Sequence, residues 1–100
     1  MVQKVILSAK ARKTFNDAID YLTQKFSEKE ILKFTDKIDE TLSIIITDPR
    51  LARKVDGRPN VYKIVINKRI VLYYQYKPLK KEILLLTFWN TLQNPKRLKF

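Results

Sequence analysis

Residues 61–89 of the chain read VYKIVINKRIVLYYQYKPLKKEILLLTFW, and this stretch decides the fold. Valine, isoleucine and tyrosine, which pack well on a pleated surface, dominate three segments that short polar turns separate. The pattern predicts strands at 61–66, 69–76 and 82–89, with a tight turn at 67–68 and a second turn at 77–81. The third strand is apolar on both faces, which is typical of an interior strand that is covered.

The pairing of the first two strands depends on the length of the turn between them. A two-residue turn at Asn67-Lys68 places Tyr62 opposite Tyr73 and Lys63 opposite Leu72. A turn that is one residue longer shifts the pairing and changes all of these neighbours. The sequence is compatible with both registers, so the side chains that share a face with Lys63 stay open.

Two amphipathic helices are predicted before the sheet. Residues 2–7 predict a short strand, after which Ser8 can cap a helix that ends near Lys25. Ser27 and Glu30 form a capping-box pattern that predicts a second helix, and Asp48-Pro49 ends it. Each helix has one apolar face, and helices joined so tightly are expected to pack as an antiparallel hairpin. The apolar positions are Ala11, Phe15, Ala18, Leu22 and Phe26, then Ile31, Phe34, Ile38, Leu42 and Ile45.

The predicted order is β-α-α-β-β-β, with a polar loop at 50–60 between the helices and the last three strands. This is an α+β fold in which a helical hairpin packs on one face of a small antiparallel sheet. A chain of 100 residues has the size of one domain, so we expect residues 1–100 to form a single domain. The face of the sheet that the helices do not cover is expected to be exposed.

The formal net charge is +11, from 21 Lys and Arg against 10 Asp and Glu. Most of it lies between residues 50 and 81, where ten basic residues accompany one acidic residue, Asp56. A surface of this kind implies an anionic counterpart: nucleic acid, an anionic membrane or an acidic protein. The basic residues are Arg50, Arg53, Lys54, Arg58, Lys63, Lys68, Arg69, Lys77, Lys80 and Lys81.

The simplest interpretation of this charge is a solvated surface that only confers solubility. An anion-binding face is favoured because tyrosines accompany the cations, and aromatic rings can stack on bases while cations hold phosphates. About half of these tyrosines are nevertheless expected to be ordinary core residues of the strands. They are Tyr62, Tyr73, Tyr74 and Tyr76.

Several kinds of chemistry are excluded by composition. The chain has no Cys and no His, so thiolate chemistry and imidazole acid–base catalysis are absent, and its one Gly cannot form a glycine-rich phosphate loop. The closely spaced acids alternate with lysines on helix faces, which indicates solvated ion pairs and not a metal site. We therefore expect no metal and no cofactor. The acids are Asp17, Asp20, Asp36, Asp39 and Glu40.

The apolar runs of the chain are short. Val5–Leu7 is too short for the apolar core of a signal peptide, and Ile44–Ile46 and Ile83–Leu86 fall far below the length of a membrane span. We expect a cytoplasmic protein that has no membrane partner. One reaction remains available to cations alone: cleavage of RNA, which supplies its own 2′-hydroxyl nucleophile while Lys or Arg stabilises the phosphate.

Along nearly its whole length the sequence resembles the RelE/ParE superfamily of bacterial toxins. The order and spacing of short segments carry the resemblance, and no single motif does. The tail resembles a subgroup in which Phe-Trp-Asp-Asn-Arg-Gln-Asn-Pro is usual, with Leu92 in place of the arginine. The segments are Ser8–Ala11, Ala18–Leu22, Phe34 with Ile38-Asp39, Asp48-Pro49, Val61–Ile64, Ile70–Tyr74, and Leu85–Asn90 with Gln93-Asn94-Pro95.

This resemblance implies the β-α-α-β-β-β fold and a toxin of a type II toxin–antitoxin pair. It also implies an acidic, partly disordered antitoxin that wraps the toxin, a partner whose charge suits this chain. RelE-like members cut mRNA on the ribosome with Lys and Arg from the second and third strands of the sheet and an acid–base residue near the C-terminus. ParE-like members instead poison DNA gyrase and lack that set of residues.

The resemblance also suggests site residues. Lys63 and Arg69 match the basic strand positions loosely, and together with Arg58 they are the candidate catalytic residues. No His or Tyr follows Tyr76, so the tail lacks the usual acid–base residue types. The candidate nucleic-acid-binding residues are Arg53, Lys54, Arg58, Lys63, Lys68 and Tyr73.

Three functions are consistent with these observations. The first expectation is a ribosome-dependent, metal-independent endoribonuclease. The alternative is an inhibitor that binds DNA gyrase and has no enzymatic activity. The third is a binding module or an inactive member of the family.

Overall fold

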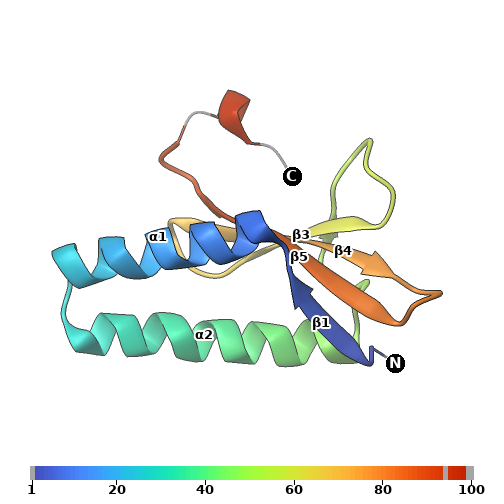
Figure 1. Ribbon diagram of the computed structural model, residues 1–100, viewed down its shortest axis with the longest axis horizontal. Helices are drawn as coiled ribbons and strands as arrows, with labels where there is room; N and C mark the ends of the chain where they lie inside the picture. The colour runs from blue at the N-terminus through green and yellow to red at the C-terminus, as the bar shows by residue number, and fades with distance from the viewer. Residues whose placement is uncertain (1, 94, 99–100) are drawn as a thin grey trace.

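The helical hairpin lies against one face of a twisted sheet in the computed structural model, which describes residues 2–93 and 95–98 (Figure 1). The predicted order of elements is confirmed, with one short strand added in the loop before the last three strands. The elements are β1 (Lys4–Leu7), α1 (Ala9–Lys25), α2 (Glu28–Thr47), β2 (Arg53–Lys54), β3 (Val61–Val65), β4 (Ile70–Lys77), β5 (Glu82–Asn90) and the short 3-10 helix η1 (Pro95–Arg97).

The sheet is mixed, whereas the sequence predicted an antiparallel one. Across the described residues its strand order is β1-β5-β4-β3-β2. β1 runs parallel to β5, with Lys4 opposite Glu82 and Leu7 opposite Leu85, and the other pairs are antiparallel. Strand β5 is interior, as predicted. The sequence predicts no strand in the loop at 50–60, but the short strand β2 forms there. A segment of two basic residues is too short and too polar to give a strand pattern that the sequence would reveal.

The turn between β3 and β4 has one residue more than the favoured two-residue turn. Val65 lies opposite Val71 and Lys63 opposite Tyr73, so the longer of the two registers is the one adopted. The side-chain oxygen of Asn67 accepts hydrogen bonds from the backbone N–H groups of Arg69 and Ile70, at 2.8 and 2.9 Å. In this turn the Asn67 side chain accepts hydrogen bonds from backbone N–H groups. In a tight two-residue turn, backbone groups of the opposite strand would take that role.

The two helices begin at the predicted serines, but only one serine caps with its side chain. Ser8 Oγ accepts from the N–H of Ala11 at 3.0 Å. Ser27 makes no side-chain cap bond, so the predicted capping box is not formed, and its carbonyl oxygen accepts from the N–H of Glu30 instead. The carboxylate of Glu30 lies 3.8 Å from Lys33, on the helix surface. Asp48 ends α2, as expected.

Ser8 also ties α1 to the sheet, and this gives a first prediction. Its hydroxyl donates to the carbonyl oxygen of Leu86 at 3.0 Å, in addition to capping the helix. Loss of a cap costs about 1 kcal/mol, and loss of a hydrogen bond between partly buried groups costs a similar amount. Ser8→Ala is therefore expected to lower the free energy of unfolding by about 2 kcal/mol in urea denaturation. Ser27→Ala is the matched control, and an equal loss in both variants would contradict this assignment.

The core lies between the helices and the inner face of the sheet. Tyr74, Leu72, Ile83 and Leu85 from the strands are almost fully buried against Ile45 and its neighbours on α2. The Tyr74 hydroxyl donates to the carbonyl oxygen of Pro49 at 2.6 Å, and its ring stacks on Tyr62 at 5.6 Å between centroids. Tyr74 therefore links the middle of the sheet to the point where the chain leaves α2.

Burial of Tyr74 predicts a loss of stability in alkali. Desolvation raises the pKa of Tyr74 well above its ordinary value of 10, with Tyr62 and Asp48 adding to the effect. Because the pKa of Tyr74 is higher in the folded than in the unfolded chain, protonated Tyr74 favours the folded state. This stabilisation is complete below about pH 10, the pKa of a tyrosine in the unfolded chain, and it is lost as the pH rises further. The free energy of unfolding is expected to fall by about 1.4 kcal/mol per pH unit above pH 10. In Tyr74→Phe, measured in parallel, this slope should be shallower; equal slopes would contradict the assignment.

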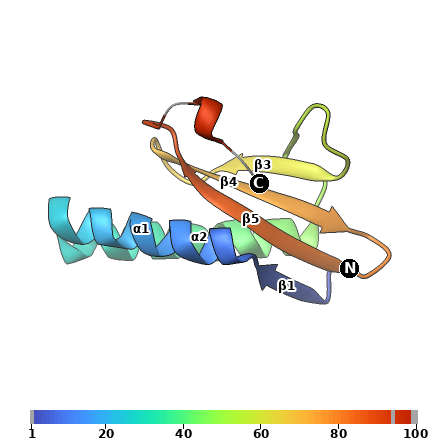
Figure 2. The ribbon, with the colours of Figure 1, turned by 45° about the horizontal axis from the view of Figure 1, so that its top comes forward.

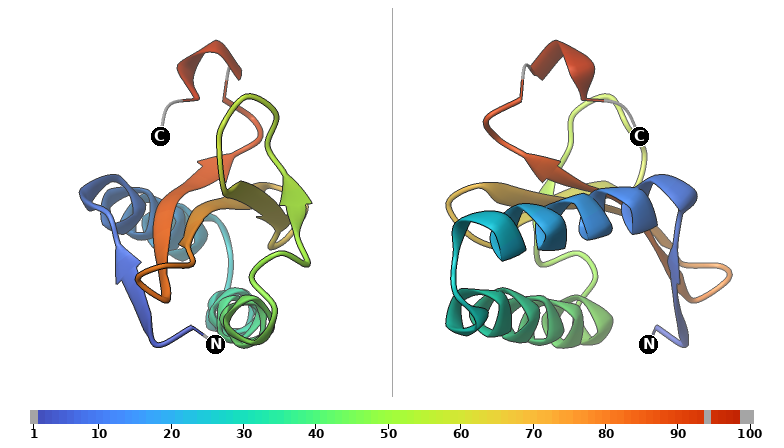
Figure 3. Two further views of the ribbon diagram at one scale, coloured as in Figure 1. Left: turned by 90° about the vertical axis from the view of Figure 1, so that its right-hand side faces the viewer. Right: turned by 60° about the vertical axis from the view of Figure 1, so that its left-hand side comes forward.

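The second face of the sheet is only partly exposed, which corrects the expectation of an open face. The loop at 55–60 and the tail at 91–93 and 95–98 both rise on this side, away from the helices (Figures 2 and 3). Val65 is 63% exposed there, whereas Tyr73 is 8% exposed and Thr87 is 1% exposed. We call this surface the outer face.

Candidate functional site

A polar row crosses the outer face from edge to interior. Arg53 of β2 lies opposite Lys63 of β3, Lys63 opposite Tyr73 of β4, and Tyr73 opposite Thr87 of β5. Residues directly opposite one another in antiparallel strands project from the same face of the sheet, about 5 Å apart at their Cβ atoms. The four side chains therefore form one row, which we call the cross-strand row.

Burial changes along the cross-strand row. Arg53 is exposed, Lys63 is half-buried, and Tyr73 and Thr87 are buried. Burial raises the pKa of Tyr73 above its ordinary value of 10, and its hydroxyl, like that of any ordinary tyrosine, is protonated at neutral pH. The row can therefore hold an anion with Arg53 and Lys63 and can donate hydrogen bonds from Tyr73. It does not supply a general base that works near pH 7.

The loop before β3 is fixed at both ends, which positions its cations. The guanidinium of Arg50 lies 5.1 Å from the centroid of the Tyr76 ring. The N–H of Val55 donates to Val61, and the N–H of Tyr76 donates to the carbonyl oxygen of Asn60, both at 2.8 Å.

Two positions give this loop its tight course. Gly57 has a φ of 75°, in the left-handed region that favours glycine, and Asn60 tolerates a similar φ of 58°. Arg58 lies between them, in the loop that rises beside the outer face (Figure 3). Lys54 lies opposite Tyr62 and therefore alternates away from the cross-strand row.

The remaining sequence candidates, Lys68 and Arg69, lie at the other end of the hairpin. Arg69 lies four residues before Tyr73, which corresponds to roughly 13 Å along an extended strand. The structure therefore brings Arg53, Lys63 and Tyr73 together but does not bring Arg69 into the same row. Lys68 and Arg69 instead line a pocket beside α1. The tail residues Asn94 and Lys99 lie outside the described residues.

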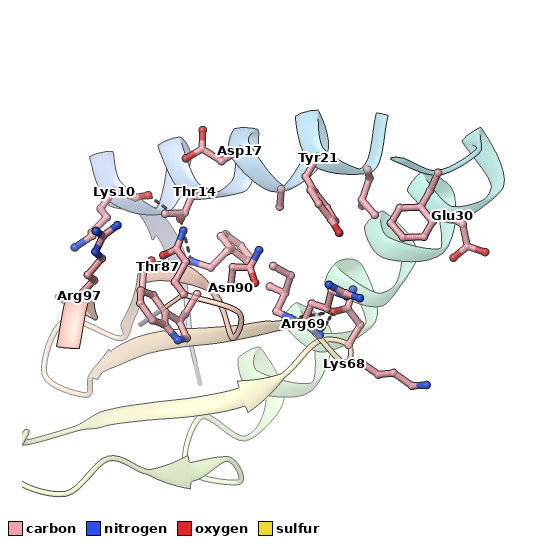
Figure 4. Close-up of a pocket in the computed structure, with 18 residues that line it drawn as sticks. Lys10, Thr14, Asp17, Tyr21, Glu30, Lys68, Arg69, Thr87, Asn90 and Arg97 are labelled. Atoms are coloured by element: carbon pink, nitrogen blue, oxygen red, sulfur yellow. Dashed lines mark hydrogen bonds between the residues drawn. The ribbon is translucent and has the colours of Figure 1, made fainter. Parts of the chain in front are cut away.

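This pocket was not anticipated from the sequence. It has a volume of about 340 Å³ and lies between α1, the end of β5, the β3–β4 turn and the tail (Figure 4). The pocket exists because β1 pairs only as far as Leu85, so α1 runs beside the unpaired part of β5. Thr14 Oγ1 accepts from the N–H of Phe88 there at 2.9 Å. No sequence pattern reports where a strand partner stops, so the pocket cannot be predicted from the sequence.

Within the described residues, three acidic residues of the helices, Asp17, Glu30 and Glu40, form surface ion pairs. Lys13 lies 3.0 Å from Asp17, and Lys37 lies 3.9 Å from Glu40, in each case one helical turn away and largely exposed. Within residues 2–93 and 95–98, no group of three or more Asp, Glu, His or Cys side chains is placed to hold a metal ion. In the same residues, no helix is both long enough and apolar enough to cross a bilayer.

Comparison with solved structures shows the fold. The chain is similar to ParDE from P. aeruginosa, with a TM-score of 0.69, 17% identity, and coverage of 90% of this chain and 96% of that chain. It is also similar to the E. coli RelBE toxin–antitoxin complex, with a TM-score of 0.63, 19% identity, and 87% and 94% coverage. The YoeB dimer from Staphylococcus aureus gives a TM-score of 0.63, 22% identity, and 89% and 97% coverage.

Comparison of the sequence identifies the family. None of the curated proteins matches the chain. The family model described as the ParE toxin of the type II toxin–antitoxin system parDE matches residues 5–95, which is most of the chain. The chain therefore belongs to the ParE toxin family, within the RelE/ParE superfamily of type II toxins that its fold and its sequence both indicate.

Proposed function

We propose that this toxin arrests growth by binding DNA gyrase, as a stoichiometric inhibitor without enzymatic activity. The cross-strand row carries the proposal. It presents two cations, Arg53 and Lys63, beside a buried tyrosine, Tyr73. Such a row binds anionic or polar groups of a target but offers no base for proton transfer. The action is proposed to be cytoplasmic because that is where gyrase acts on DNA.

Ribosome-dependent mRNA cleavage is the second candidate, and one observation favours it. Lys63 and Tyr73 are direct neighbours in the row, so a phosphate held by Lys63 would lie within reach of a hydroxyl that can donate a proton. In this function Lys63 and Arg58 are the proposed catalytic residues, and Arg69, at the other end of the hairpin, would act only on a more distant part of the same RNA. Arg53, Lys54, Lys68 and Tyr73 would add phosphate or base contacts.

A neutralising antitoxin of acidic character is the proposed partner in either case. The net charge of +11 is concentrated in residues 50–81, which include Arg53, Lys63 and Tyr73 of the cross-strand row and the loop beside it. Opposite charge speeds association and masks such a surface. The intact E. coli RelBE complex and the YoeB–YefM complex from Staphylococcus aureus are toxin–antitoxin assemblies of the same fold.

The two candidate functions separate in one experiment. The toxin is expressed under tight control, and mRNA integrity and plasmid supercoiling are followed together. The purified protein is also titrated into a gyrase supercoiling assay. Growth arrest with intact mRNA and inhibited supercoiling is the expected result. Cleaved mRNA with normal supercoiling would favour the second candidate, and undisturbed growth would indicate an inactive family member.

A further inference from the structure

The turn between β4 and β5 carries a leucine that the described part of the chain leaves uncovered. Leu79 is 99% exposed, whereas Leu92, the next most exposed leucine among the described residues, is 66% exposed. The turn extends beyond the end of the sheet (Figures 1 and 2). A single exposed leucine on a flat surface is ordinary. A leucine at the tip of a projecting turn can enter an apolar phase without a change in the fold.

Backbone hydrogen bonds fix the shape of this turn. The N–H of Lys81 donates to the carbonyl oxygen of Pro78 at 3.2 Å, and the N–H of Gln3 donates to the carbonyl oxygen of Lys81 at 2.7 Å. Lys81 has a φ of 54°, which reverses the chain, and the ring of Pro78 fixes its own φ. Leu79 is therefore presented in a preformed turn, and binding through it requires little ordering of the chain.

The surroundings of Leu79 are cationic. Four lysines lie at this end of the sheet, and Glu82 is the one acid among residues 77–82. Glu82 lies opposite a lysine on each of its neighbouring strands, β1 and β4, so its charge is offset there. The turn therefore presents an apolar tip within positive charge. The lysines are Lys4, Lys77, Lys80 and Lys81.

This combination of side chains favours a lipid surface over a protein or a nucleic acid. Affinity between proteins resides mainly in Trp, Tyr and Arg, while lysine is depleted at their interfaces. Nucleic acid is held by cations and stacked aromatic rings, and a leucine offers no stacking. An anionic bilayer matches both parts of the turn, because lysines approach its headgroups while an apolar side chain enters the boundary with the acyl chains. The short apolar runs of the sequence argue against a membrane span, but surface contact needs no such run.

We propose that the β4–β5 turn is a peripheral contact for an anionic lipid bilayer. Leu79 enters the boundary between headgroups and acyl chains, and Lys80 and Lys81 lie against the anionic headgroups. The contact lies at the end of the hairpin opposite the β3–β4 turn, and it leaves the pocket beside α1 uncovered. This inference goes beyond the proposed function, since it gives Leu79 no part in binding the target.

A fluorophore at the tip of the turn tests the contact directly. The chain has no cysteine, so Leu79→Cys gives the full-length toxin one position for an environment-sensitive label. Vesicles of phosphatidylcholine that contain phosphatidylglycerol are expected to raise the emission of the label and shift it to the blue, and vesicles of phosphatidylcholine alone are not. The matched control is Leu32→Cys, at a leucine that is 62% exposed on α2, one turn from Glu28 and from Asp36. Its label is expected not to respond.

Sedimentation of unlabelled toxin with the same vesicles measures the contribution of the leucine. Leu79→Ser is expected to weaken binding to the phosphatidylglycerol vesicles about tenfold, because it removes the apolar group that inserts. Leu32→Ser is expected to bind as the parent protein does. Circular dichroism checks that both variants fold.

A second pair of variants separates the lysines of the turn from net charge. The double variant Lys80→Gln with Lys81→Gln is expected to bind about 25-fold more weakly, because each lysine near the surface contributes about a fivefold factor. Lys25→Gln with Lys29→Gln makes the same change of charge at exposed positions near the link between the helices. That variant is expected to bind within about threefold of the parent protein, since salt screens charges that do not approach the headgroups.

Three results would overturn the proposal. Equal losses in the two double variants would indicate attraction by net charge alone. Sedimentation with vesicles without a response of the label at position 79 would place the contact on another face. A response of that label to an oligonucleotide and not to vesicles would make the turn a contact for nucleic acid. Because the vesicles contain neither gyrase nor mRNA, failure here is distinct from failure of the proposed function.

Discussion

Lys63→Ala is expected to weaken binding of the toxin to its target by roughly 30- to 150-fold and to abolish growth arrest at moderate expression. Lys63 lies in the middle of the cross-strand row, with Arg53 on one side and Tyr73 on the other. Its half-buried position means that its charge is less screened by solvent than that of a fully exposed lysine. Loss of one partly desolvated charged contact costs about 2–3 kcal/mol of binding free energy, and this cost gives the expected weakening of target binding.

The measurement is inhibition of supercoiling by purified protein, together with plating efficiency after induction. Lys63→Arg keeps the charge and should retain most of the activity, whereas Lys80→Ala removes an exposed charge in the turn after β4 and should have no effect. The folding of each variant is checked by circular dichroism and thermal melting. If folded Lys63→Ala inhibits as strongly as the parent protein, the row is not the surface that contacts the target.

Tyr74→Ala is expected to lower the free energy of unfolding by about 3–5 kcal/mol, a large part of the 5–15 kcal/mol that a typical domain has. The Tyr74 side chain is fully buried, its ring stacks on Tyr62, and its hydroxyl holds the carbonyl oxygen of Pro49. Removal of the ring creates a cavity at the centre of the core and also leaves that carbonyl oxygen without its partner. Urea denaturation of the purified variant gives the value directly.

Tyr74→Phe separates the two contributions of this side chain. It keeps the ring and its stacking on Tyr62 but removes the hydroxyl, so a loss of about 1–2 kcal/mol is expected. Because Pro49 begins the loop that carries Arg53 and Arg58, this variant should also raise the susceptibility of the loop to proteolysis. A loss in Tyr74→Phe as large as that in Tyr74→Ala would mean that ring packing contributes nothing.

The helices and the main strands could be predicted because their signals are local. Ser8 caps α1 and Asp48-Pro49 ends α2, and each depends only on residues within one or two turns of it. The β3–β4 register was not decided because it depends on whether Asn67 uses its side chain to accept backbone hydrogen bonds. Both turn lengths satisfy the pattern of apolar residues, so propensity could not select between them.

The site was predictable in composition but not in arrangement. The basic stretch directed attention to Arg53, Lys63 and Tyr73, and the observed register makes them one row. The family resemblance grouped Arg69 with Lys63, although Arg69 lies four residues before Tyr73, the residue opposite Lys63. Thr87 carried no signal at all, because a single threonine in an apolar strand predicts only a β-branched strand residue.

Pairing of β1 with β5 has a consequence for synthesis of the toxin. The first strand lies beside residues 82–85, so a ribosome must translate everything between β1 and β5 before this pair can form. Contacts between such distant parts of a chain form late and slowly, since a long loop must close first. A nascent chain that ends before β5 therefore lacks the strand that pairs with both β1 and β4, and it lacks an assembled cross-strand row. The surface that we propose binds the target is therefore complete only after β5 has been translated.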